Sequence, residues 1–120
     1  MAEKDGLGRA GEERAARYFE ECGYAVLDRN WRSPGGELDL VVATATQLVV
    51  VEVKTRRTAR FGHPLEAVDA RKRGRLWRLA IAWIAAHPGD VQGRRLRIDA
   101  VGIIGEDPRI GSIEHIEDVA

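Results

Sequence analysis

Three carboxylates and one amine lie close together in two neighbouring apolar runs of the sequence, at Glu37, Asp39, Glu52 and Lys54. A two-residue hairpin loop at 45–46 would place Asp39 opposite Glu52 on antiparallel strands. The same register places Glu37 opposite Lys54. Directly opposed carboxylates repel each other, which makes such a pair a poor choice on a purely structural strand. A divalent cation reverses this argument, because Mg²⁺ is held by carboxylates together with water and phosphate oxygens.

The residues around these charges indicate whether the charges form a metal site or lie on a solvated strand end. Glu37, Asp39, Glu52 and Lys54 share one face of the two expected strands, and the opposite face is wholly apolar. The charged face also becomes apolar towards the turn, as in interior strands. The alternative is a solvated end with cross-strand ion pairs such as Glu37–Lys54. In the site hypothesis, the metal activates a water molecule, and Lys54 orients that water or neutralises the charge that develops on a phosphoryl group.

Apolar periodicity and loop residues indicate the elements that must position this group. We expect helices over 7–22 and 66–86, and strands over 24–31, 37–44, 47–54, 94–104 and 111–116. The order α-β-β-β-α-β-β predicts an antiparallel meander, with the long helix crossing over to a fourth strand. The fold class is therefore α/β, with a mixed central sheet flanked by helices. A chain of 120 residues is expected to form a single domain, 1–120.

The second half of the long helix, from Leu76 to Ala86, is apolar nearly all round, with Arg78 as its one polar residue. Trp77 and Trp83 are six positions apart, so they cannot both face the sheet easily. Two explanations remain open at this point: another element of the chain covers the outer side, or a second copy covers it in a homodimer.

The chain has a net charge of zero, yet its charges are strongly polarised along its length. Residues 54–97 contain twelve Lys/Arg against three acids. We predict that a basic rim contacts a DNA backbone without reading bases. Its residues are Arg56, Arg57 and Arg60 in the loop expected at 55–63, and Arg71, Lys72 and Arg75 at the start of the long helix. A solvated, arginine-rich helix start is the alternative.

The remaining composition excludes several classes of protein. A single cysteine, Cys22, excludes a disulfide framework and favours a reducing, cytoplasmic setting. The N-terminus carries charges and lacks the apolar run of a signal peptide. The most apolar stretch, 76–86, is too short to span a bilayer, so we expect no membrane association.

Four motifs occur in a fixed order: Gly36-Glu37-Leu38-Asp39, then Val51-Glu52-Val53-Lys54-Thr55-Arg56, then Phe61-Gly62, then Arg97 and Asp99 as R-x-D. Together they resemble the PD-(D/E)xK nuclease superfamily. The chain looks closest to the YraN family of small endonuclease-like bacterial proteins, which are similar in fold to archaeal Holliday-junction resolvases. The resemblance extends from Gly8 to about Asp118.

The resemblance implies roles for individual residues. Asp39 and Glu52 match the metal-binding acids, and Lys54 matches the catalytic lysine. Glu12 matches an acid that many members add from an N-terminal helix. Helical spacing places Glu12 on the same edge as Ala16 and Phe19, so Glu12 borders the core. The late R-x-D is expected to be structural or to support the site, and Glu37 belongs to the signature without an assigned metal contact.

The expected fold is thus of the restriction-endonuclease-like kind. The expected function is a Mg²⁺- or Mn²⁺-dependent endonuclease that hydrolyses DNA phosphodiester bonds, at branched or otherwise structured sites. One alternative is a catalytically silent DNA-binding or assembly module on a nuclease scaffold. Another is a protein-interaction subunit that uses the apolar half of the long helix. Fold alone does not choose among them, because function depends on the site.

Overall fold

Five strands form one sheet in the computed structural model, which describes residues 6–60 and 62–119. Phe61, part of one sequence motif, lies outside the described residues. The elements are α1 (Gly6–Glu21), β1 (Ala25–Ser33), β2 (Gly36–Ala43), β3 (Gln47–Arg56), α2 (Ala70–Ala86), β4 (Arg95–Ile104) and β5 (Ser112–Ile116), with 3₁₀ turns at Pro64–Ala67 and Pro88–Asp90. The predicted order α-β-β-β-α-β-β and the α/β class are confirmed.

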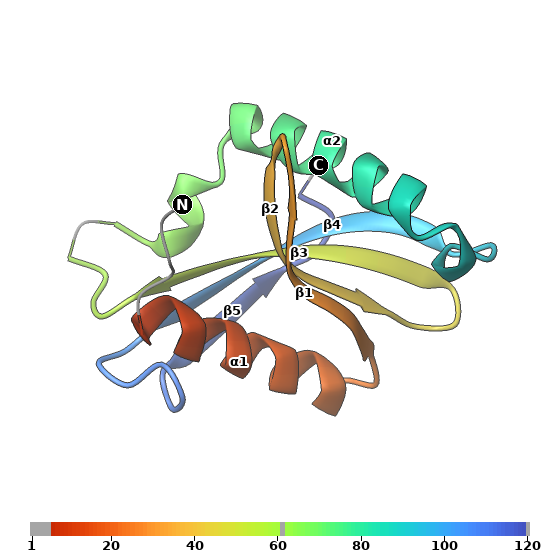
Figure 1. Cartoon of the computed structure of the whole chain (residues 1–120). Coiled ribbons are helices and arrows are strands. Elements are labelled where there is room, and N and C mark those ends of the chain that lie inside the picture. The colour runs from red at the N-terminus through yellow and green to blue at the C-terminus, as the bar shows by residue number, and fades with distance from the viewer. Residues whose placement is uncertain (1–5, 61, 120) are drawn as a thin grey trace.

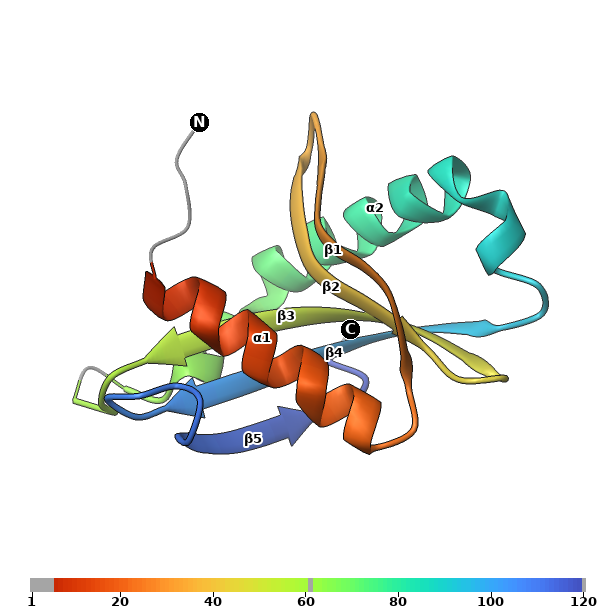
Figure 2. The same cartoon turned by 60° about the horizontal axis from the view of Figure 1, so that its bottom comes forward.

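The spatial order of the strands is the same as their order in the chain, from β1 to β5. Only β3 and β4 are parallel, and α2 lies in the crossover between them, as a parallel connection requires. The helices cover opposite faces of the sheet, α1 on one and α2 on the other (Figures 1 and 2). Two separate apolar cores result, one under each helix.

Helix α1 packs closely on the sheet because small residues line its buried side. Ala15, Ala16 and the larger Phe19 are fully buried against β3 and its neighbours. At Gly11 there is no room for a methyl group, since a Cβ there would collide with the side chain of Thr55. The helix ends before Gly23, whose φ of +93° is a conformation that glycine adopts without strain.

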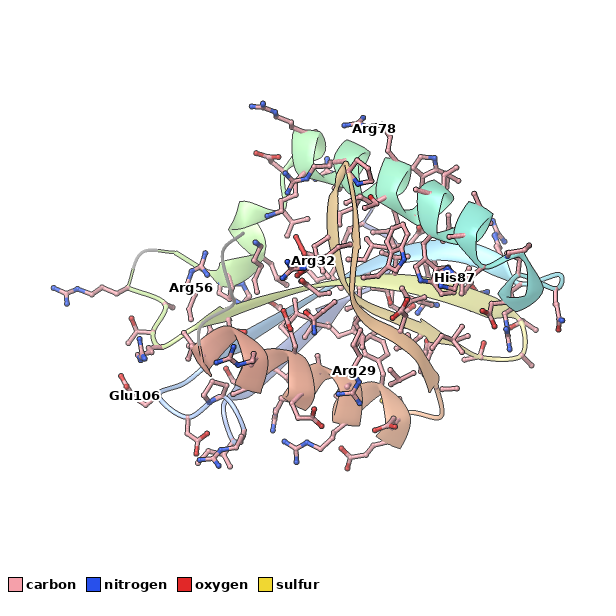
Figure 3. The ribbon with its side chains drawn as sticks, viewed as in Figure 1. Arg29, Arg32, Arg56, Arg78, His87 and Glu106 are labelled. Carbon is pink, nitrogen blue, oxygen red and sulfur yellow. The ribbon has the colours of Figure 1, made fainter. Side chains whose placement is uncertain are left out.

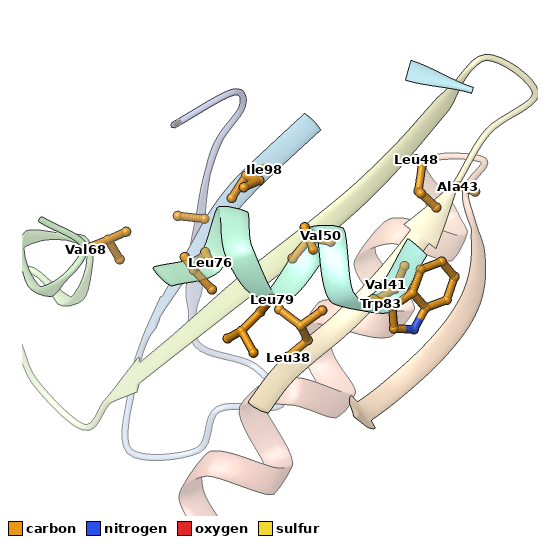
Figure 4. Close-up of a cluster of buried hydrophobic side chains, with 12 residues drawn as sticks. Leu38, Val41, Ala43, Leu48, Val50, Val68, Leu76, Leu79, Trp83 and Ile98 are labelled. Atoms are coloured by element: carbon orange, nitrogen blue, oxygen red, sulfur yellow. The ribbon is translucent and has the colours of Figure 1, made fainter. Parts of the chain in front are cut away.

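Helix α2 buries one side and exposes the other. Leu76, Leu79 and Trp83 pack on the apolar face of the sheet that includes Leu38 and Val50 (Figure 4). Burial of each such side chain contributes about 1.5–3 kcal/mol.

The opposite side of α2 carries two large apolar residues in solvent, Trp77 at 43% exposure and Ile81 at 49%. The expectation that Trp77 and Trp83 point to different sides is therefore confirmed. In the described part of the chain, no helix has the length and apolar run that a bilayer crossing requires.

Strands β1 and β2 form a long hairpin that curves out of the sheet towards α2 (Figures 1 and 2). The hairpin turns at Pro34 and Gly35, and Gly36 begins β2 with a φ of +138°. A Cβ at Gly36 would lie only 3.4 Å from a methyl group of Leu79. The hairpin tip therefore lies beside α2, above the plane of the other strands.

The register between β2 and β3 is the predicted one, with Val41 paired to Val50 and Leu40 to Val51. The ladder stops at the pair Leu40–Val51, which is one step before Asp39 and Glu52 would be directly opposed. This departure follows from the curvature of the hairpin, which takes β2 away from β3.

Most predicted boundaries differ from the structure by one or two residues, and the start of the long helix differs by four. The long helix begins at Ala70 rather than at Glu66, because the side chain of Asp69 accepts a hydrogen bond from the Lys72 N–H and caps the helix there. Strand β3 continues to Arg56, inside the loop expected at 55–63, because Arg56 still pairs with Ile104 of the parallel neighbour β4.

Candidate metal centre

The site lies where β2 and β3 separate. Beyond the last ladder pair, the carboxylate of Asp39 accepts a hydrogen bond of 2.9 Å from the Val53 N–H. A side-chain oxygen thus replaces the backbone acceptor that a continued strand would have supplied. Asp39 is only 6% exposed, and the bond fixes its orientation between the two strands.

Three acids converge at this point: Glu12 from α1, and Glu37 and Asp39 from β2. One carboxylate oxygen from each lies within 4.8 Å of the others. Glu12 is 9% exposed, and Arg32 donates a hydrogen bond of 2.8 Å to Glu37. Clustered, largely buried carboxylates repel each other unless cations compensate them. Three carboxylate oxygens at this spacing could hold a metal ion.

Glu52 lies next to this triad, on the side of Asp39. It is 6% exposed, and burial together with the nearby charge of Asp39 raises its pKa to about 7. Two ammonium groups act in the opposite direction, since the Nζ atoms of Lys72 and Lys54 lie 3.4 Å and 3.9 Å from Glu52 Oε2. Because its pKa is raised, this carboxyl group keeps its proton to a higher pH than an ordinary glutamate does.

Lys54 is the amine of the site. Burial lowers its pKa, and the neighbouring ammonium group of Lys72 lowers it further, although Glu52 and Asp39 act in the opposite direction. Lys54 comes from the end of β3 and Lys72 from the first turn of α2, so the crossover helix brings a second amine to Glu52. An amine with a lowered pKa exchanges its proton more readily near neutrality.

A hollow of about 170 Å³ opens beside Glu12 and Asp39. Arg29 lines it and forms an ion pair of 2.7 Å with Glu13 of α1 (Figure 3). Asn30 also lines the hollow, with a φ of +52° in the middle of β1. Asparagine adopts this left-handed conformation more readily than most non-glycine residues. The hollow is the approach to the acids from the side of α1.

The predicted basic rim occupies more than one surface. Arg71, Lys72, Arg75 and Arg78 line a groove of about 370 Å³ at the start of α2, together with Asp69.

The arginines after β3 are placed differently. Arg57 lines another hollow, which it shares with Arg109 and two acids of the loop between β4 and β5. Arg56 extends from the end of β3 (Figure 3), where its guanidinium donates to the Thr55 carbonyl. Arg60 is an exposed residue of the following loop. Of the predicted rim, Arg71, Lys72 and Arg75 of α2 thus line one groove.

The late R-x-D motif forms a buried ion pair. Asp99 is fully buried and accepts two hydrogen bonds of 2.8 Å from Arg97. It also contacts His115 Nε2 at 2.7 Å and accepts from the Asp118 N–H. These contacts fasten β5 and the following segment to β4, which is a structural role. Tyr18 of α1 adds a hydrogen bond to the other nitrogen of His115.

The structure therefore brings together Glu12 and Asp39, as the resemblance implied, and adds Glu37. Glu52 and Lys54 adjoin this triad through Asp39. Glu37 had no metal contact assigned from the sequence, although its place in the Gly-Glu-x-Asp signature was a usable sign that it lies beside Asp39. Asn30 was missed. An asparagine inside a strand is disfavoured, and that was the available sign.

The fold and the site together define a small α/β protein with a cluster of acids where two central strands part. The chain belongs to the uncharacterised protein family UPF0102, whose profile matches residues 11–103. This confirms the YraN-type resemblance at the level of the family. The matched segment contains Glu12, Glu37, Asp39, Glu52, Lys54 and Lys72.

Relatives cover nearly the whole chain. A UPF0102 protein of Paenarthrobacter aurescens is 45% identical over 99% of this chain and 97% of its own length. A UPF0102 protein of Beutenbergia cavernae is 46% identical over 99% of both chains. A UPF0102 protein of Frankia alni is 54% identical over 73% of each. The similarity therefore spans both helices and all five strands.

Proposed function

We propose that this protein is a Mg²⁺- or Mn²⁺-dependent endonuclease that hydrolyses DNA phosphodiester bonds, at branched or otherwise structured DNA. One observation carries the proposal: Glu12, Glu37 and Asp39 converge within 4.8 Å beside a buried Glu52 and Lys54. A merely structural sheet gains nothing from four acids in this position, whereas phosphodiester hydrolysis needs a cation and an amine at one point. The resemblance to PD-(D/E)xK nucleases supports the same assignment.

Each residue has a separate task in this proposal. Glu12, Glu37 and Asp39 hold the ion, and the Val53 N–H keeps Asp39 in orientation. Glu52 supplies a further oxygen once it is ionised. The metal, when bound, activates a water molecule and stabilises charge on the phosphoryl group. Lys54 orients the attacking water or neutralises the developing negative charge at the phosphate.

The DNA backbone is proposed to lie along the groove lined by Arg71, Lys72, Arg75 and Arg78. Cations at the start of a helix oppose its dipole and cost a few tenths of a kcal/mol each. Such an arrangement is favourable when phosphates approach the same helix end. Contacts of this kind position a duplex without reading its sequence, so recognition is proposed to rest on DNA shape. The proposed setting is the cytoplasm, which fits the exposed free thiol of Cys22.

The direct test is cleavage of plasmid, flapped and four-way-junction DNA with Mn²⁺ and with Mg²⁺. Lys54→Ala should abolish cleavage while DNA binding persists, because the metal ligands and the groove stay intact. Arg17→Ala, an exposed change on α1, is the matched control and should cleave like the wild type. DNA binding without cleavage under either metal would instead indicate the catalytically silent module, and absence of DNA binding would indicate a protein-interaction subunit.

The exposed apolar side of α2 supports the homodimer hypothesis as a second, separate proposal. Trp77 and Ile81 are one helical turn apart and both largely in solvent, in the half of the helix that the sequence singled out. Sedimentation of wild type and Trp77→Lys over a range of concentrations tests it. A wild type that stays monomeric at all concentrations removes the hypothesis without affecting the endonuclease proposal.

A further inference from the structure

Lys72 is the one described residue that both contacts an acid of the candidate metal centre and lines the basic groove. Its Nζ lies 3.4 Å from Glu52 Oε2, and its side chain also lines the groove of about 370 Å³ with Arg71, Arg75 and Arg78. The side chain is 21% exposed, against 8% for that of Glu52. A single amine thus lies at the boundary between the buried acids and the surface proposed to bind DNA.

The backbone of Lys72 is fixed, whereas its ammonium group is not. The Lys72 N–H donates a hydrogen bond of 2.9 Å to the capping carboxylate of Asp69, and α2 is anchored on the sheet by Leu76 and Leu79. Beyond this anchored backbone, the lysine has a flexible four-carbon stem with a compact charge at its end. Its ammonium can therefore exchange one anionic partner for another nearby without any movement of the helix.

The ion pair with Glu52 stabilises the fold little, because a partly exposed lysine gains little from one carboxylate after the loss of hydration and side-chain entropy. The same oxygen, Oε2, also faces Lys54 at 3.9 Å. A metal ion that uses Glu52 has to compete with these ammonium groups for that carboxylate. Substrate phosphates in the groove would offer Lys72 an alternative anion.

We propose that Lys72 is a positioning residue that holds Glu52 while the groove is empty and moves to a backbone phosphate when DNA occupies the groove, which frees Glu52 for the metal ion. This inference rests on the proposed endonuclease function and deepens it. Binding of DNA and binding of metal then strengthen each other, and by thermodynamic linkage the coupling has the same size in both directions. The metal centre is completed only on a bound substrate.

The first measurement is Mn²⁺ affinity without DNA, by calorimetry at pH 8. Lys72→Met keeps the length and helical preference of the side chain but removes its charge. We expect it to bind Mn²⁺ about five- to tenfold more tightly than wild type, which corresponds to about 1–1.4 kcal/mol of competition. Arg17→Met removes an exposed charge of α1 outside the basic groove, and its Mn²⁺ affinity should stay within about twofold of wild type. Thermal melts confirm that each variant is folded.

The second measurement is the affinity for a short four-way-junction DNA as a function of salt, with Ca²⁺ in place of Mn²⁺ to limit turnover. If Lys72 moves to a phosphate, Lys72→Met should lower the slope of log affinity against log salt by about one. Lys72→Arg retains a cation and should restore the slope.

The outcomes separate this inference from the proposed function. Equal Mn²⁺ affinity in wild type and Lys72→Met, or an unchanged salt slope in Lys72→Met, overturns the role of Lys72 and leaves the endonuclease proposal standing. A wild type that binds neither Mn²⁺ nor DNA overturns both.

Discussion

Replacing Glu52 with glutamine removes a buried charge while it preserves the shape and size of the side chain. In the metal-free protein, the pKa of Glu52 is raised from 4.5 to about 7, first by burial and then by Asp39. An acid whose pKa is raised on folding destabilises the folded state when it ionises. The folded protein therefore loses stability as the pH rises from about 4.5, and the loss is complete above about pH 7. The glutamine variant has no such loss.

The size of the effect follows from the same pKa. A rise from 4.5 to about 7 corresponds to about 3 kcal/mol in the free energy of unfolding, as an order of magnitude. Between pH 5 and pH 8, about 2–3 kcal/mol of this should appear. Glu52→Gln also removes the ion pairs with Lys54 and Lys72 wherever Glu52 is ionised, and the raised pKa already includes their effect. The informative quantity is therefore the change with pH in the difference between variant and wild type.

Urea unfolding at pH 5 and pH 8, with EDTA present, measures this quantity. Relative to wild type, the unfolding midpoint of Glu52→Gln should rise by about 1 M or more on going from pH 5 to pH 8, given typical urea dependences. Glu20→Gln removes the same charge from an exposed position of α1 and controls for net charge. If the difference in unfolding midpoint between Glu52→Gln and wild type does not change with pH, the pKa of Glu52 is not raised by folding. The electrostatic account of the site is then wrong.

Three further outcomes follow from contacts in the structure. Gly11→Ala should destabilise the fold by about 1–3 kcal/mol in urea unfolding, because the new methyl group meets Thr55. Thr55→Ala should restore part of this loss. An unchanged unfolding midpoint in Gly11→Ala would show that α1 can move away from β3. Mn²⁺ at a hundredfold excess over its dissociation constant should stabilise the wild type by about 2.7 kcal/mol, and EDTA should reverse the gain. Glu12→Gln should lose most of that gain, and a full gain in this variant would remove Glu12 from the metal ligands. Asp99→Ala should cost about 3–5 kcal/mol, because Arg97 is left without its buried partner, whereas a loss below about 1 kcal/mol would contradict the structural role.

The sequence predicted the β2–β3 hairpin well because two local rules agree there. Alternation with a period of two assigns side chains to faces, and the short connection after Ala43 fixes the register. Val41 therefore pairs with Val50 as expected. Glu12 was placed near the core from helical spacing alone, and it is largely buried.

The rest of the site could not be derived locally, because it depends on how whole elements curve and pack. Register alone places Glu37 opposite Lys54, but the outward curve of the hairpin carries Glu37 to Glu12 and to Arg32 instead. Lys72 lies on another element, so its contact with Glu52 depends on how the crossover helix docks. The start of α2 was misplaced for a simpler reason: two helix-compatible segments adjoin, and the capping side chain of Asp69 separates them.

The hydrogen bond between Asp39 and the Val53 N–H limits what mutagenesis at position 39 can show. The same carboxylate closes a gap in the sheet and is a proposed metal ligand, so chain architecture and chemistry cannot be varied separately at this position. Asp39→Ala would remove the Val53 N–H acceptor and a proposed ligand in one step, and its inactivity would say little about mechanism. Substitutions at Lys54 and Glu12, whose side chains close no gap between strands, separate the two effects.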